Sequence, residues 1–176
     1  MNQTSRGLII LDRDGTIIKH VHHLAKETLV ELLPHSGSVL RKLQEKNFEI
    51  AIASNQSIIG RGIASFEQVE RINNKVLSLL SQFDVSISKV CICPHTPLDD
   101  CSCRKPKPKM GLTIMEELGY TNKNTIVVGD TVTDIDFAKN LGARSILLSS
   151  NMENPHIKTI HCSSWDEIYD RLTGIF

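Results

Sequence analysis

The chain alternates between two patterns of apolar and polar residues. Short apolar runs at residues 8–11, 48–53, 125–129 and 145–148 end in polar or turn residues, and a further run at 85–92 has polar positions interleaved. Runs of this length, rich in Val, Ile and Leu, predict strands, and the uninterrupted runs predict strands buried on both faces.

Between these runs, apolar residues recur at helical spacing. The predicted helices are residues 36–46, a helix behind a Ser65/Gln68 capping box, residues 109–119 and 133–141, and a short helix behind Ser164 and Glu167. In the helix behind Ser65, we expect these residues to lie on one helical face: Val69, Ile72, Val76, Leu79, Leu80 and Phe83. Strands that alternate with helices predict an α/β fold, a Rossmann-like parallel sheet with helices on both faces. No large cap domain fits between residue 11 and the next helix, or between Ala64 and Val85.

Length and charge narrow the classes of function. The 176 residues, 40% hydrophobic, suit one domain spanning residues 1–176. Lys+Arg and Asp+Glu number 20 each, and this zero net charge argues against a nucleic-acid partner. No apolar run reaches the roughly 18 residues that a membrane span needs. The N-terminal residues lack the apolar core of a signal peptide, so we expect a cytoplasmic monomer with no membrane partner.

Acidic side chains stand at the ends of two predicted strands. Asp12 and Asp14 follow the first strand, and Asp130 follows the run at 125–129. Parallel strands place ligands at their carboxyl ends, and residues two apart in an extended chain point the same way. Carboxylates held close together need a cation between them, and oxygen ligands suit Mg²⁺. We therefore expect Asp12, Asp14 and Asp130 to bind Mg²⁺; the alternative is that Asp14-Gly15 is only a turn and Asp130 only a helix cap.

Cysteine and histidine residues form a second cluster of candidate metal ligands. Cys93-Pro94-His95 is followed by Cys101-Ser102-Cys103, two close pairs joined by a short loop. Three thiolates and one imidazole form a closed tetrahedral set typical of structural zinc, so we expect Cys93, His95, Cys101 and Cys103 to bind Zn²⁺. The alternative is a surface loop of free thiols, which leaves unexplained how a loop with almost no apolar residues is ordered.

Basic and polar residues near these clusters suit a phosphate group. Arg104 and Lys105 directly follow the zinc pattern, and an arginine fork with a compact ammonium binds a phosphoryl group well. The segment Ser54-Asn55-Gln56-Ser57 ends the second strand, where a hydroxyl and backbone N–H groups can surround phosphate oxygens. Gly60-Arg61-Gly62 forms a basic loop after it. The cluster of His20, His22 and His23 is either a second metal site or loop histidines beside a cleft.

Taken together, these motifs resemble the haloacid dehalogenase-like phosphatases. Leu11-Asp12-Arg13-Asp14-Gly15-Thr16 and Gly129-Asp130 carry the family resemblance, which extends from Leu8 to about Leu148. The Cys-Pro-His and Cys-x-Cys-Arg-Lys-Pro block narrows it to two branches of the family, the heptose bisphosphate phosphatases and the histidinol-phosphate phosphatases. The heptose enzymes often carry a basic residue where this chain has Thr131.

The resemblance implies a role for each matching residue. Asp12 is the nucleophile that becomes an aspartyl-phosphate, and Asp14 is the general acid and then the base. Mg²⁺ is held by Asp12, the backbone carbonyl of Asp14, and Asp130. Ser54 and Lys105 stabilise the phosphoryl group. The residues expected to bind substrate are Asn55, Gln56, Ser57, Arg61 and Arg104.

Three functions remain open at this point. The first is removal of one phosphate from D-glycero-D-manno-heptose 1,7-bisphosphate, a small phosphorylated sugar of surface-polysaccharide synthesis. The second is hydrolysis of histidinol phosphate, whose ammonium group would need a further carboxylate near the pocket; the candidates are Glu27, Glu31, Asp99 and Asp100. The third is a zinc-stapled binding module without turnover.

Overall fold

One parallel sheet organises the protein. The structure, a computed structural model, describes residues 6–149 and 159–175. Within them lies a six-stranded sheet of order β3-β2-β1-β4-β5-β6. The strands are β1 (Gly7–Leu11), β2 (Phe48–Asn55), β3 (Lys89–Cys93), β4 (Thr125–Gly129), β5 (Arg144–Leu148) and β6 (Ile160–Cys162). The direction of the order reverses between β1 and β4, and the carboxyl ends of strands at such a point form a crevice for ligands.

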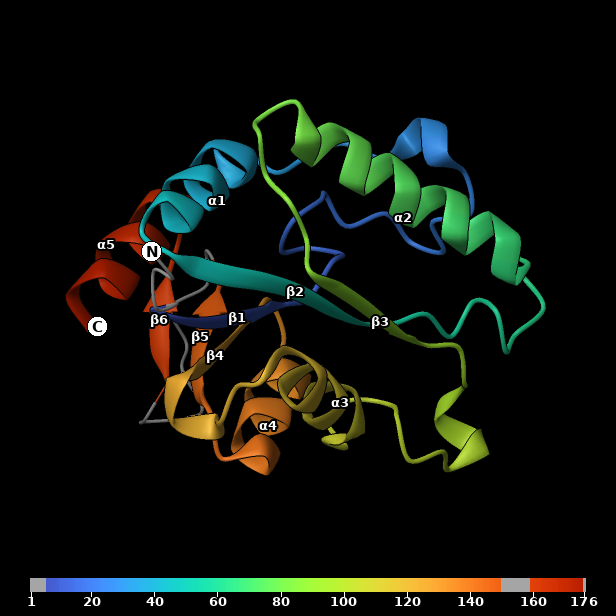
Figure 1. The fold of residues 1–176 in the computed structure, drawn as a ribbon. Coiled ribbons are helices and arrows are strands. Elements are labelled where there is room, and N and C mark those ends of the chain that lie inside the picture. The colour runs from blue at the N-terminus through green and yellow to red at the C-terminus, as the bar shows by residue number, and fades with distance from the viewer. Residues whose placement is uncertain (1–5, 150–158, 176) are drawn as a thin grey trace.

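Helices cover both faces of the sheet, as Figure 1 shows. One face carries α1 (Ser36–Glu45), α2 (Phe66–Ser81) and α5 (Trp165–Ile175), and the other carries α3 (Lys109–Leu118) and α4 (Val132–Leu141). Short 3-10 turns are η1 (Glu27–Leu29), η2 (Pro97–Asp99) and η3 (Asn122–Asn124). The predicted Rossmann-like sheet with helices on both faces is confirmed, and β1 joins α1 through a segment whose only helical turn is η1, so no large cap domain lies there.

Side-chain alternation along β1 fills two separate cores. Ile9 and Leu11 pack with residues of α1, α2 and α5, whereas Leu8 and Ile10 pack with α3 and α4. All four side chains are fully buried. A strand buried on both faces needs a continuous apolar run, which is why the sequence pattern predicted it.

Two predicted features differ from the structure, and one strand was not predicted. The strand expected at 85–92 is β3, which begins only at Lys89, opposite Ala51 of β2, because residues 84–88 connect α2 to the edge of the sheet. Phe83 lies beyond the end of α2 and is 41% exposed, since the chain turns at Asp84, whose φ is 57°. The edge strand β6 was not predicted; it pairs with β5 over three residues only.

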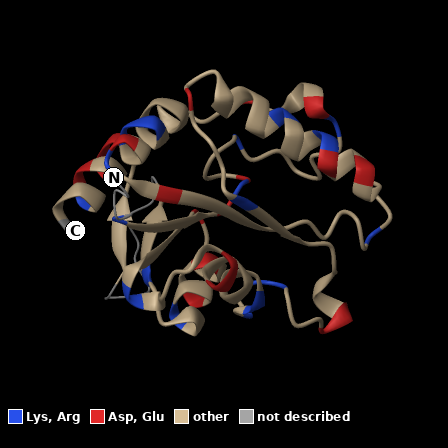
Figure 2. Ribbon diagram, viewed as in Figure 1, with Lys and Arg blue, Asp and Glu red and all other residues tan. Residues whose placement is uncertain are grey.

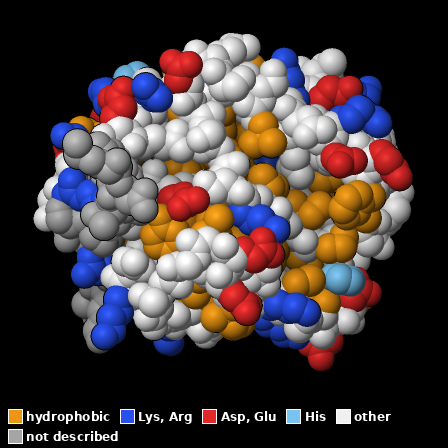
Figure 3. Space-filling view, in the orientation of Figure 1, with side chains coloured by type: hydrophobic (Ala, Val, Ile, Leu, Met, Phe, Trp, Pro, Cys, Tyr) orange, Lys and Arg blue, Asp and Glu red, His pale blue; other side chains and the backbone are white. Residues whose placement is uncertain are grey.

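The surface carries both signs of charge. Lys/Arg and Asp/Glu are interspersed over the helices in Figure 2, without a single basic stripe on that side of the molecule. In Figure 3, apolar side chains gather over the segment that joins β2 to α2, near the carboxyl edge of the sheet. No helix among the described residues combines the length and the hydropathy of a membrane-spanning segment.

Candidate active site

A cavity of 680 Å³ opens at the carboxyl ends of β1, β2 and β4. Its walls contain all four predicted catalytic residues and the predicted third metal ligand, Asp130. Two of the predicted substrate-binding residues, Asn55 and Arg104, also line it. The complete lining is Asp12, Asp14, His20, Ser54, Asn55, Arg104, Lys105, Pro106, Asp130, Thr131, Thr133 and Asp134. The fold therefore brings together acidic strand ends that lie far apart in the sequence.

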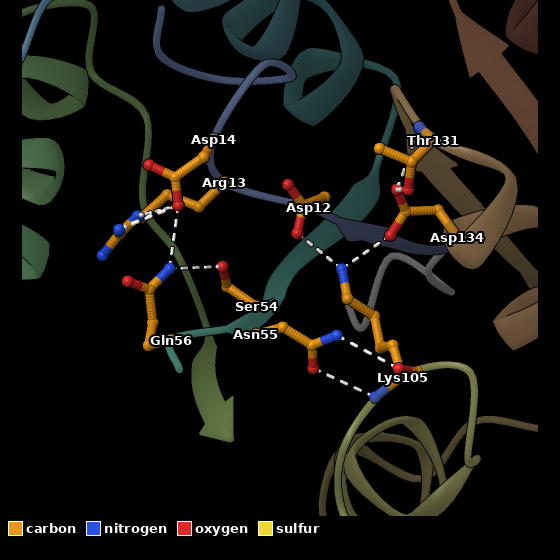
Figure 4. Close-up of polar contacts among 9 residues, drawn as sticks. All are labelled: Asp12, Arg13, Asp14, Ser54, Asn55, Gln56, Lys105, Thr131 and Asp134. Atoms are coloured by element: carbon orange, nitrogen blue, oxygen red, sulfur yellow. Dashed lines mark hydrogen bonds and ion pairs between the residues drawn. The ribbon is translucent and has the colours of Figure 1, made fainter. Parts of the chain in front are cut away.

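A buried ammonium joins two carboxylates at the centre of this cavity. Lys105 Nζ lies 2.5 Å from Asp12 Oδ1 and 2.6 Å from Asp134 Oδ1 (Figure 4). Asp134 is in turn fixed by Thr131, whose hydroxyl and backbone N–H donate to Oδ2 at 2.7 and 3.2 Å. Gly129 leaves room for Asp134, because an added Cβ there would come within 2.3 Å of the Asp134 side chain. Asp134 thus orients Lys105 toward Asp12.

Burial and crowding shift the acidities of these groups. The pKa of the Asp12 carboxyl is raised to about 7, chiefly because burial disfavours its charged form; Lys105 opposes this shift and Asp134 adds to it. Burial lowers the pKa of Lys105, but the carboxylates of Asp12 and Asp134 outweigh it and hold that pKa above its ordinary value. The pKa of Asp130 is raised to about 6, again chiefly by burial and then by Asp134. The ammonium of Lys105 alone therefore does not offset the effects of burial and of Asp134 on the pKa values of Asp12 and Asp130.

Asp14 lines the same cavity but is held by other partners. Its Oδ2 accepts hydrogen bonds from Arg13 Nε and Nη2 at 3.1 and 2.8 Å, and from Gln56 Nε2 at 2.8 Å. In Figure 4 the Asp14 carboxylate turns toward Arg13 and Gln56, and that of Asp12 toward Lys105. Spacing by two residues therefore places both side chains at one cavity, and their carboxylates face different partners. The other oxygen of Asp14, Oδ1, is buried and has no hydrogen-bond partner.

Ser54 sits beside the acids in a fixed orientation. Its side chain is 1% exposed, and its Oγ accepts a hydrogen bond from Gln56 Nε2 at 2.9 Å. Because a hydroxyl is both donor and acceptor, this bond leaves the hydroxyl proton of Ser54 for a group in the cavity. Gln56 thus fixes Ser54 and Asp14 at once.

The donor set of the cavity suits Mg²⁺. An added Cβ on Gly15 would come within 2.1 Å of Asp130 Oδ2, so the Asp130 carboxylate lies directly against the backbone that follows Asp14. Asp12 is tied to the strand beside it through its N–H, which donates to the carbonyl of Val128 at 2.9 Å. Carboxylate and carbonyl oxygens are the ligands that Mg²⁺ prefers. Burial, and then the neighbouring Asp134, raise the pKa values of Asp12 and Asp130, so a cation bound between these carboxylates would favour their ionised forms.

The predicted zinc ligands meet at one point. Ligand atoms of Cys93, His95, Cys101 and Cys103 all lie within 4.8 Å of one another, and theirs is the only such cluster among the described residues. The three Sγ atoms are 3.2 to 3.6 Å apart, and His95 Nδ1 lies 3.6 Å from Cys93 Sγ and 3.3 Å from Cys103 Sγ. Three thiolates and one imidazole at such separations fit a closed tetrahedral site. His20, His22 and His23 form no comparable cluster.

A second cavity of 230 Å³ adjoins the first. The two share Asp14, His20 and Asn55. The other three predicted substrate-binding residues, Gln56, Ser57 and Arg61, line this second cavity and not the first. The remaining lining is Arg13, Val21, His22, His23, Leu24 and Ile58.

Sequence reasoning missed two residues behind the site. Arg13 is 1% exposed, and its Nη1 donates to Asn73 Oδ1 of α2 at 2.6 Å. From the sequence, an arginine between two aspartates is expected to be solvated. Its burial and its contact with the distant Asn73 are seen only in the structure. The regular spacing of α2, which places Asn73 next to the buried Ile72, is the one sequence signal that could have indicated it.

Comparison with known proteins decides the family. The model of the haloacid dehalogenase-like hydrolases matches residues 19–142, well over half of the chain. This chain belongs to the haloacid dehalogenase-like hydrolase family.

Relatives with named activities resemble most of the chain. A D-glycero-beta-D-manno-heptose-1,7-bisphosphate 7-phosphatase of Pseudomonas aeruginosa is 33% identical over 148 residues, 83% of each chain. The histidine biosynthesis bifunctional protein HisB of Legionella pneumophila is 32% identical over 81% of this chain, which spans 41% of that longer protein. A crystal structure of the D,D-heptose 1,7-bisphosphate phosphatase from B. bronchiseptica, complexed with magnesium and phosphate, has a TM-score of 0.88 and 26% identity, covering 96% of this chain and 98% of that one.

Proposed function

We propose that this haloacid dehalogenase-like protein is a Mg²⁺-dependent phosphatase that removes one phosphate from D-glycero-D-manno-heptose 1,7-bisphosphate. The observation that carries the proposal is the convergence of Asp12, Asp14, Ser54, Lys105 and Asp130 on one cavity. A nucleophile, an acid–base group, a hydroxyl donor, a cation and a metal ligand are the parts that phosphate monoester hydrolysis needs.

Hydrolysis proceeds in two displacements at phosphorus. A carboxylate oxygen of Asp12 attacks the phosphorus atom, and the bond to the sugar oxygen breaks while Asp14 donates a proton to that oxygen. The product is an aspartyl-phosphate on Asp12 and a free sugar hydroxyl. Asp14, now a carboxylate, accepts a proton from a water molecule that attacks the same phosphorus atom. This second displacement releases inorganic phosphate and restores the Asp12 carboxylate.

Ser54 and Lys105 act on the phosphoryl group during both displacements. The Ser54 hydroxyl donates to a phosphoryl oxygen, and the Lys105 ammonium balances the charge of the group in transfer. Mg²⁺, held by Asp12, the Asp14 backbone carbonyl and Asp130, would neutralise phosphoryl oxygens and the crowded carboxylates. Arg104 and Asn55 contact substrate in the catalytic cavity; Gln56, Ser57 and Arg61 contact it in the second one. Cys93, His95, Cys101 and Cys103 would hold Zn²⁺, which would order the loop that carries Arg104 and Lys105.

The named relatives, and the positions of the four candidate carboxylates, favour the sugar bisphosphate over histidinol phosphate as the substrate. An ammonium-bearing substrate would need a carboxylate near the pocket, and none of the four candidates lines either cavity. Glu31 pairs with Lys19, Glu27 lies 3.8 Å from Arg71, Asp99 accepts from Thr96 and Asp100 pairs with Lys107. Each of these carboxylates already has a partner elsewhere.

A panel of substrates tests the proposal. The purified protein, with Mg²⁺ and with its zinc content measured in the same sample, should release phosphate from the heptose bisphosphate with a higher kcat/KM than from histidinol phosphate. The opposite preference would reject the proposed substrate, and no Mg²⁺-dependent hydrolysis of any ester would leave the zinc-stapled binding module. We place this activity in the cytoplasm and assign it to a monomer that acts on a small phosphorylated sugar.

A further inference from the structure

The residues between the two pairs of proposed zinc ligands have no apolar core. They leave the edge strand β3, pass through the short turn η2 and return toward α3 (Figure 1). Residues 97–100 are all exposed, and Leu98 is 95% exposed. A segment without buried apolar side chains depends on polar contacts and on bound metal for its order. The polar contacts of this stretch therefore bear directly on how firmly the cluster holds a metal ion.

Lys107 contacts this stretch from outside the ligand set. Its Nζ lies 2.5 Å from Asp100 Oδ1, 2.8 Å from the carbonyl oxygen of Cys101 and 3.3 Å from the carbonyl oxygen of Asp100. An ammonium has three N–H donors, so these three acceptors use all of them. Two of the acceptors are backbone atoms, and one of these belongs to a proposed zinc ligand. Lys107 therefore fixes the backbone of Cys101 and of the residue before it.

The backbone of Asp100 is turned toward Lys107. Its φ is 42°, in the left-handed region that aspartate enters more readily than most residues. In this conformation both the carbonyl oxygen and the carboxylate of Asp100 contact the same ammonium. Asp100 directly follows η2 and directly precedes Cys101, so its conformation sets the path of the chain into the second ligand pair.

The same lysine is tied to the turn that carries Lys105. The Lys107 N–H donates to the carbonyl of Arg104 at 2.8 Å, across residues 104–107. Arg104 and Lys105 line the catalytic cavity. Lys107 thus joins the second ligand pair, through its side chain, to the turn beside that cavity, through its backbone.

A surface ion pair by itself would not make Lys107 important. Its side chain is 46% exposed and that of Asp100 is 93% exposed, and exposed pairs contribute little to stability. Two features distinguish this contact from such a pair. The ammonium also donates to two carbonyl groups, and three thiolates carry more negative charge than one Zn²⁺ balances, so the occupied site would attract a nearby cation.

We propose that Lys107 is a positioning residue for zinc, whose ammonium holds Asp100 and Cys101 in the arrangement that lets Cys101 and Cys103 bind the metal. This inference rests on the zinc site of the proposed function and is independent of hydrolysis. Loss of the ammonium leaves all four ligands in the chain and loosens the backbone of one of them. Groups that orient metal ligands typically contribute about tenfold to a hundredfold to metal affinity.

Competition for zinc tests this role. The zinc-loaded protein is mixed with increasing amounts of a chromophoric chelator, which gives the dissociation constant for zinc. Lys107→Met removes the charge and the three donors at similar length, and it should raise this constant by about tenfold or more. Lys109→Met is the matched control, because Lys109 Nζ makes its one printed-length polar contact among the described residues with Ser102 Oγ, at 3.3 Å. It removes the same charge beside the second ligand pair without freeing the backbone, so its constant should stay close to that of the unsubstituted protein.

The outcomes separate this role from the zinc site itself. A dissociation constant that rises in Lys107→Met and not in Lys109→Met supports the proposal. Equal constants in all three proteins would overturn it. Equal rises in both variants would overturn it too, since positive charge near the thiolates, rather than the backbone contact, would then retain the metal. If the unsubstituted protein binds no zinc, the proposed zinc site fails, whatever its hydrolytic activity.

Discussion

The side chain of Asn55 pairs with the backbone of Lys105 through both of its amide atoms. Nδ2 donates to the Lys105 carbonyl at 3.1 Å, and Oδ1 accepts from the Lys105 N–H at 3.0 Å (Figure 4). The last residue of β2 therefore fixes the backbone of the residue whose ammonium contacts Asp12. This pairing joins the sheet to the loop that carries the Cys/His cluster, beside the cavity that contains Asp12.

Loss of this pairing should lower turnover. Asn55→Leu removes both hydrogen bonds at similar size, and a shift of about 1 Å in a catalytic group can cost about a hundredfold in rate. We expect kcat for a phosphate ester to fall by about tenfold to a hundredfold, measured with saturating Mg²⁺. Asn74→Leu, an exposed position on α2, is the control. A kcat equal to that of the control would show that Lys105 holds its position without Asn55.

Substitution of one of the four residues that we propose as zinc ligands should also act through Lys105. Cys101→Ser leaves three ligands for a metal that needs four, so we expect loss of bound zinc and of most Mg²⁺-dependent hydrolysis. The matched control is Cys91→Ser, since Cys91 lies on β3 outside the cluster and should keep its zinc. Elemental analysis and an activity assay on the same samples give the answer. Full activity in a zinc-free Cys101→Ser protein would contradict the structural role of the metal.

The crowded acids should make the Mg²⁺-free protein less stable as the pH rises. The folded-state pKa values of Asp12 and Asp130, about 7 and about 6, exceed the ordinary value of 3.8, so the folded state binds protons that the unfolded state releases. The stability contributed by these protons is complete below that ordinary value and is lost as the pH rises through about 6 to 7. Thermal unfolding of zinc-loaded protein in Mg²⁺-free buffer should therefore show a Tm that falls across this range.

Added Mg²⁺ should reverse that trend, because it binds the ionised carboxylates. Its effect on Tm should be larger at about pH 8 than at about pH 5. Asp12→Asn should weaken both the pH dependence and the response to Mg²⁺. A Mg²⁺ effect that is the same at both pH values would show that the raised acidities do not belong to the metal site.

The buried contact between Arg13 and Asn73 should contribute to stability. Asn73→Leu removes the acceptor of Arg13 Nη1 and leaves a buried N–H without a partner, which costs about 1–3 kcal/mol in the free energy of unfolding. Denaturant unfolding measures this difference, with Asn74→Leu as the exposed control. Asn73→Asp keeps an oxygen opposite Arg13 and should retain most of the stability. Equal unfolding free energies for the two leucine variants would be the contrary result.

Much of the fold could be predicted because local patterns and tertiary packing agree. The run Leu8–Leu11 is apolar throughout because both of its faces are buried, and the capping box of Ser65 and Gln68 marks the start of α2 in sequence and in structure alike. The edge strand β6 lacked such a pattern, since a strand of three residues paired on one side has no period to read.

The sequence predicted which residues the fold brings together, and it predicted their contacts less well. The acids at the strand ends and the Cys/His pairs could be singled out because residue type and spacing alone suggest their chemistry, and the structure places them at one cavity and in one cluster. The hydrogen-bond partners of the site's side chains come from segments that are distant in the sequence. Examples are Asn73, which accepts from Arg13, and the Lys105 backbone, which pairs with Asn55. No local pattern encodes such a contact, so it becomes visible only in the folded chain.

Trapping the covalent intermediate tests the central claim most directly. The protein is mixed with a radiolabelled phosphate ester and Mg²⁺, quenched rapidly in acid, and digested to locate the label. We expect label on the peptide that contains Asp12, and none on any peptide of Asp12→Asn, which should also release no phosphate. Rapid release of phosphate by the unsubstituted protein with label on another residue, or undiminished release by Asp12→Asn, would contradict it.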